Sequence, residues 1–101
     1  MLKLICAAIM SATIAQADPC AEMGEMGQII MQVRQMGGNM SDLIGPLSAQ
    51  PESAVRDIAI AMVKDAYSQP RYNTPEFQQN ATRDFSNGVE SLCYSKMGEL
   101  E

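Results

Sequence analysis

The side chains that most often perform chemistry in small proteins are scarce in this chain. It contains no histidine, and so lacks the commonest general base and the commonest metal ligand. Two carboxylate pairs, Asp57 with Asp65 and Glu22 with Glu25, are spaced to share a helix face. Such acids on a helix face are usually solvated, so we interpret them as surface residues rather than as a site for acid–base chemistry. Since there is no phosphate-binding loop or catalytic signature either, we predict that the protein is not an enzyme.

The positions of the three cysteines favour a structural role. Cys6 lies in an apolar N-terminal stretch, whereas Cys20 and Cys93 lie far apart in the rest of the chain. In an exported protein an even pair of cysteines predicts a disulfide, so we expect Cys20 and Cys93 to be bonded rather than to be two free thiols. Such a bond would leave no thiolate nucleophile in the mature chain.

Residues 1–17 have the features of a cleavable export signal. Lys3 provides the positive charge, and residues 4–14 form an apolar stretch interrupted only by small polar residues. Ala15-Gln16-Ala17 predicts cleavage before Asp18. The apolar run is shorter than a bilayer span needs, so we expect no membrane anchor after cleavage. The sequence therefore predicts a single domain over residues 18–101, soluble in the periplasm.

Net charge limits the classes of partner. Without Lys3, residues 18–101 carry six basic and twelve acidic side chains, a net charge of −6. This balance argues against nucleic acid and anionic membrane surfaces as partners. It is compatible with a basic protein partner, and equally with a role in solubility alone.

Methionine is the one over-represented residue with possible chemistry. Five methionines lie in or just after the first predicted helix: Met23, Met26, Met31, Met36 and Met40. Thioethers bind Cu(I), which makes a copper carrier an alternative. Met23 and Met26 share a face with Ile30 and Val33, however, so we interpret them as core residues and predict no cofactor. An adaptable Met-rich docking surface is a third interpretation.

The elements that must position these residues are all predicted to be helices. Helical periodicity and capping residues predict long helices over residues 19–36, 51–68 and 75–96, and a short helical turn within 39–47. The apolar stripe of the second helix is Val55, Ile58, Ala59, Met62, Val63, Ala66 and Tyr67. That of the third is Phe77, Ala81, Phe85, Val89 and Leu92. No segment indicates a β-strand, so the predicted fold is a small all-α bundle of three main helices plus one short helix, stapled by one disulfide.

Several helix breakers interrupt this pattern. Gly24 and Gly27 weaken the first helix, and we expect them to allow close approach of another helix. Gly37-Gly38 ends that helix, and Gly45-Pro46 breaks or kinks the short one. Asn87-Gly88 predicts a kink or break within the last helix.

The linker over residues 68–74 is the candidate contact site. Two prolines restrict it, so it loses little conformational entropy on binding. Arg71 and Tyr72, with the preceding Tyr67, are residue types enriched at binding hot spots. The alternative is that both tyrosines pack the helix junction and that Arg71 pairs with a nearby acid.

One resemblance extends over most of residues 18–101. It rests on the segment from Ala66 to Phe77, on Asp84-Phe85, on residues 30–43, and on Cys20 and Cys93. In these residues the chain resembles an uncharacterised family of small exported helical proteins of proteobacteria and their phages. That family has no assigned activity, so the resemblance implies a periplasmic location and no functional residue.

The function that we predict is therefore protein binding without catalysis, of the inhibitor or immunity type. One alternative is a periplasmic acid-stress chaperone, which the chain is similar to in size, charge and single disulfide. Such a chaperone would expose its Met-rich helix when carboxylates protonate. The other alternative is a carrier of copper or a small ligand. The sequence does not identify the partner or the oligomeric state.

Overall fold

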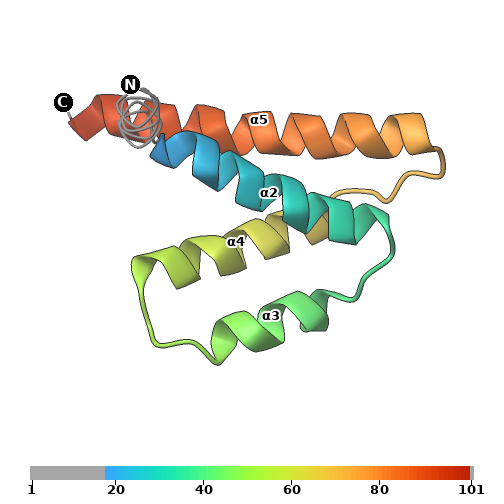
Figure 1. Ribbon diagram of the computed structural model, residues 1–101, viewed down its shortest axis with the longest axis horizontal. Coiled ribbons are helices and arrows are strands. Elements are labelled where there is room, and N and C mark those ends of the chain that lie inside the picture. Colours follow the sequence, from blue (N-terminus) through green and yellow to red (C-terminus); the bar gives the residue numbers. More distant parts are fainter. Residues whose placement is uncertain (1–17, 101) are drawn as a thin grey trace, which may run out of the picture.

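Four helices connected by short loops make up the described chain. The computed structural model describes residues 18–100, with side chains through Met97, and the predicted export signal lies outside these residues. The helices are α2 (Pro19–Gln35), α3 (Met40–Ser48), α4 (Ala54–Ser68) and α5 (Pro75–Leu100) (Figure 1). No strand occurs among residues 18–100, which confirms the prediction of an all-α fold.

Capping side chains fix where three of the helices begin. Asp18 accepts hydrogen bonds from the backbone N–H groups of Cys20 and Ala21 at the start of α2. Ser53 caps α4 through the N–H of Arg56, at 3.0 Å. Thr74 precedes Pro75 and accepts from the N–H of Phe77, at 3.3 Å.

The first helix ends as predicted at a glycine in the left-handed conformation. Gly37 has φ of 88°, which a residue with a Cβ adopts only at a cost. Its N–H donates to the carbonyl of Arg34, and the N–H of Gly38 donates to the carbonyl of Val33. This paired arrangement satisfies carbonyls that the helix end would otherwise leave unbonded.

Three predicted boundaries need correction. The second long helix begins at Ala54 rather than at residue 51, because Ser53 provides the cap. The short helix begins at Met40, after Asn39, and continues through Pro46 to Ser48 instead of ending within residues 39–47. Pro46 removes the helix hydrogen bond to the carbonyl of Asp42, and Asp42 is an exposed residue of this short helix.

The predicted break at Asn87-Gly88 is wrong, since α5 is continuous to Leu100. An Asn-Gly hairpin turn needs positive φ, and Gly37 is the only residue with positive φ in the described part of the chain. Contacts with α2 hold the helix before the pair, and Val89, which packs at Gly27, holds it after the pair. Phe85 is buried, and the Ser86 hydroxyl donates to the carbonyl of Gly24 at 2.8 Å.

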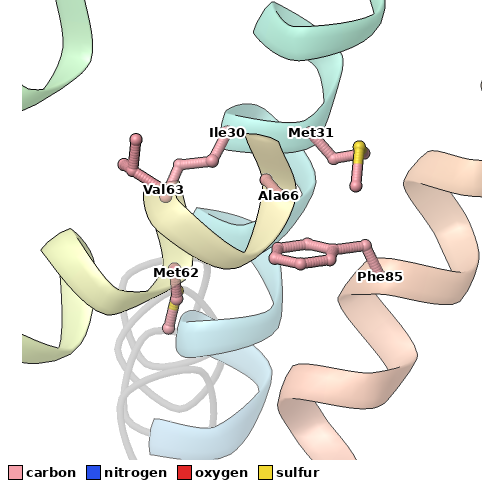
Figure 2. Packing of buried hydrophobic residues seen from close by; sticks show 6 residues of the cluster. All are labelled: Ile30, Met31, Met62, Val63, Ala66 and Phe85. Atoms are coloured by element: carbon pink, nitrogen blue, oxygen red, sulfur yellow. The ribbon is translucent and has the colours of Figure 1, made fainter. Parts of the chain in front are cut away.

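Helix α2 lies between the other elements and organises the bundle. It packs against α5 along much of its length and against α4 on another side, while α3 packs on α4 (Figure 1). Figure 2 shows the core that forms where α2, α4 and α5 meet. Its buried members are Ile30, Met31, Met62, Val63, Ala66 and Phe85.

Close packing of α2 on α5 confirms the expectation for Gly24 and Gly27. A Cβ on Gly27 would lie 3.0 Å from Cγ2 of Val89, and one on Gly24 would overlap the Glu90 side chain. At the end of the same contact Cys20 and Cys93 form the predicted disulfide, with Cα atoms 5.5 Å apart. The bond joins the first turn of α2 to the C-terminal part of α5.

Candidate functional site

The predicted linker site is built into the helix junction, beginning with Tyr67. Its hydroxyl donates to the carbonyl of Gly38 at 2.6 Å, and the Arg34 guanidinium lies over its ring, 5.2 Å from the centroid. The ring is half-buried against the core. Tyr67 therefore ties α4 to the loop that follows α2.

Gln35, which sequence reasoning did not single out, holds the linker in place. Its side chain is 2% exposed, its Nε2 donates to the carbonyl of Pro70 at 3.0 Å, and its Oε1 accepts from the N–H of Tyr72 at 2.8 Å. Arg34 adds a bond from Nη2 to the carbonyl of Gln69, at 3.1 Å. No local signal marks Gln35, because its partners lie 35 and 37 residues away.

Arg71 and Tyr72 are both exposed on the linker. Nε of Arg71 donates to the backbone carbonyl of Gln35 at 3.0 Å, at the C-terminal end of α2 where a cation is favoured. Tyr72 is 39% exposed and packs on Phe77, with ring centroids 6.2 Å apart. The three predicted residues thus lie near one another, and Tyr72 with Phe77 offers an aromatic contact.

A larger candidate site lies between α4 and α5, an apolar groove of about 760 Å³. The two helices run in opposite directions and splay apart (Figure 1). Met23 of α2 and the core residues Met62 and Phe85 contribute to its lining, and Cys93 lies at its edge. Its other lining residues are Ile58, Ala61, Asp65, Gln69, Asp84, Gly88, Val89, Leu92, Lys96 and Met97.

Several apolar side chains of this groove are exposed to solvent. Ile58 is 42% exposed and Leu92 62% exposed, although each continues the apolar stripe of its helix. Met97 is 43% exposed and packs against the sulfur of Cys20. Helix α2 covers only the middle of each stripe, around Val63 of α4 and Phe85 of α5.

The two ends of the groove carry different charged residues. Asp65 of α4 and Asp84 of α5 lie at one end, together with Gln69. Because α4 and α5 are antiparallel, Ile58 and Leu92 lie toward the other end, with Lys96 and Met97. Asp84 also lies 3.9 Å from Nε of Arg83, but both side chains are largely exposed, so that pair is weak.

A short hydrogen bond joins the start of α2 to α5 near the disulfide. The Tyr94 hydroxyl donates to Oδ2 of Asp18, the residue that caps α2. This bond lowers the pKa of Asp18, and the two backbone N–H groups that it accepts from add to the effect. The same bond raises the pKa of Tyr94, because it favours the neutral phenol.

The methionines are distributed as core residues more than as a ligand cluster. Met23 and Met26 pack against the core, which agrees with their interpretation, and Met31 is fully buried. Met36 is 80% exposed because it follows the last turn of α2. Within residues 18–100, no group of three or more His, Cys, Asp or Glu residues is placed to hold a metal ion.

Comparisons with known proteins give no indication of function. No family model, curated protein or solved structure matches the chain. The resemblance to exported helical proteins therefore remains a prediction. In the described part of the chain, no helix combines the length and the apolar character needed to cross a membrane.

Proposed function

We propose that residues 18–101 form a non-enzymatic protein-binding module of the periplasm, which acts on a partner as an inhibitor or immunity factor does. The contact surface in this proposal is the apolar groove between α4 and α5. The observation that carries it is the exposure of Ile58, Leu92 and Met97 in one continuous groove. Apolar surface left open beside a folded core is typical of a binding groove.

The walls of the groove favour a helical occupant. Two splayed helices over a third make a trough that accepts the apolar face of another helix, with anchors one turn apart. Strand addition needs an exposed sheet edge, and residues 18–100 contain no strand. The occupant is therefore expected to be an amphipathic helix of a partner protein.

Site-specific photocrosslinking tests this proposal. The full chain is produced in its own bacterium with p-benzoylphenylalanine in place of Leu92, and separately in place of Ile29, which is 59% exposed on α2 and outside the groove. We expect one discrete adduct from position 92 and none from position 29. Equal adducts at both positions, or none at position 92, would overturn the proposal.

The aromatic contact of Tyr72 with Phe77 supports a second contact surface at the linker. Both rings are exposed, and Gln35 fixes the backbone of Tyr72 through a 2.8 Å bond. A photocrosslinker in place of Tyr72 separates the two surfaces. Adducts from position 72 and not from position 92 would identify the linker, and not the groove, as the contact surface.

A further inference from the structure

The geometry points to a basic amphipathic helix of another protein as the segment that the groove binds, oriented with its cationic residues at the Asp65 and Asp84 end. This inference rests on the proposed function and adds the charge, length and direction of the occupant. It draws on the lining of the groove, the span of its walls and the net charge of the domain.

The length of the groove sets the length of the helix. On α5 the lining runs from Asp84 to Met97, and on α4 from Ile58 to Gln69. At 1.5 Å per residue these walls extend about 20 Å and about 17 Å, which is three to four helical turns. Apolar anchors at i, i+3, i+4 and i+7 would then face Leu92, Val89 and Phe85.

The charges of the groove set the sign of the occupant. Asp65 on α4 and Asp84 on α5 lie toward the same end of the groove, so that end favours cations on the bound helix. Because both aspartates lie toward this one end, the asymmetry gives the helix a direction. An acidic helix meets repulsion at the aspartate end.

The same charges disfavour two other occupants. A second copy of this domain carries the same net charge of −6, so pairing of two copies is opposed by repulsion. An anionic bilayer is repelled for the same reason. A basic helix is the occupant for which both the apolar lining and the charge are complementary.

Three fluorescent peptides of about 14 residues test the inference by anisotropy, since this length spans the groove. They share one leucine face and carry lysine, glutamine or glutamate elsewhere. We expect the lysine peptide to bind about tenfold more tightly than the glutamate peptide. Asp65→Asn and Asp84→Asn should each weaken the lysine peptide about threefold and leave the glutamine peptide unchanged.

Matched variants separate this inference from the proposed function. Leu92→Ser should weaken every peptide, whereas Ile29→Ser, at a similarly exposed apolar residue, should weaken none. Equal binding of the lysine and glutamine peptides, still dependent on Leu92, would overturn the charge assignment and leave the groove as the contact surface. The inference of a basic helix would be overturned by peptide binding that is unchanged in Leu92→Ser, by absence of peptide binding, or by a dimer that excludes the peptides. In each case the crosslinks from position 92 would still test the proposed function separately.

Discussion

At the scale of single residues, one buried amide does what apolar packing cannot do. The Gln35 side chain binds the backbone of the linker at two points. It donates to the carbonyl of Pro70 and accepts from the N–H of Tyr72. A buried amide with both ends satisfied fixes direction as well as distance. The exposed rings of Tyr72 and Phe77 therefore depend on a residue of another helix for their position.

The first prediction concerns Gln35→Ala. Removal of the amide leaves the carbonyl of Pro70 and the N–H of Tyr72 without these partners, so we expect the free energy of unfolding to fall by about 2 kcal/mol. Urea unfolding followed by circular dichroism measures the change. Gln32→Ala is the matched control, because Gln32 is exposed one turn earlier on α2. A loss no larger than that of the control would contradict the role of Gln35.

The second prediction concerns pH and the bond between Tyr94 and Asp18. The pKa of Asp18 is lowered from 3.8, so its contribution to stability is present above pH 3.8 and is lost as pH falls through the folded-state value. The pKa of Tyr94 is raised from 10.0, so its contribution is present below pH 10 and is lost as pH rises through the folded-state value.

Tyr94→Phe tests this linkage, because it removes the hydroxyl and keeps the ring. The urea midpoints of the variant and the unsubstituted protein should differ most between pH 5 and pH 9, and should converge as pH falls from 3.8 through the lowered folded-state pKa of Asp18. Tyr72→Phe is the control. A gap between the Tyr94→Phe and unsubstituted midpoints that stays constant down to pH 2 would show that Asp18 does not sense this bond.

At the scale of elements, the continuity of α5 allows a third prediction. Gly88 lies within α5, has no positive φ, and would have no atom within 4 Å of an added Cβ. Gly88→Ala should therefore raise the free energy of unfolding by about 1 kcal/mol, because alanine loses less backbone entropy in a helix. Thermal and urea unfolding measure the gain.

Gly27→Ala is the matched comparison for Gly88→Ala. It offers the same gain in helix propensity, but its Cβ would lie 3.0 Å from Val89 at the contact of α2 with α5. We expect that crowding to offset the gain. If both substitutions stabilise the protein equally, the two helices are not in the close contact described.

Local chemistry explains which parts of this fold could be predicted. Asp18, Thr74 and Gly37 mark helix ends by rules that act within a few residues, so those boundaries were foreseen. Asn87-Gly88 was misread because contacts of Phe85 and Ser86 with α2, distant in sequence, override the local preference. The groove was missed for the same reason: the apolar stripes were correct, but the splay of α4 from α5 leaves Ile58 and Leu92 uncovered.

At the scale of the whole molecule, the open groove has a cost in stability. A three-helix core that covered Ile58 and Leu92 would gain about 1 kcal/mol or more from each side chain. This domain leaves them exposed, and the cluster of buried apolar side chains among its described residues has six members. A small domain with so little burial needs another source of stability.

The disulfide is the source that the structure provides, and the last prediction follows from it. Cys20 and Cys93 are 73 residues apart, and closing a loop of this length stabilises a fold by about 4 kcal/mol in the chain-entropy model. The double variant Cys20→Ser/Cys93→Ser should lose stability of this order. Urea unfolding of the variant and of the oxidised protein measures the loss.

A second readout separates the bond's effect on the unfolded chain from its effect on the groove. The bond lies at the groove edge beside Met97, so a role in shaping the groove would change peptide binding by variant molecules that are still folded. A role confined to the unfolded ensemble would lower the urea midpoint and leave peptide affinity unchanged at low temperature. We expect the second result, because α2 is held against α5 without the disulfide. The two helices pack closely at Gly24 and Gly27, and Ser86 donates a hydrogen bond across the contact. Loss of affinity in folded variant protein would instead make the disulfide part of the binding site.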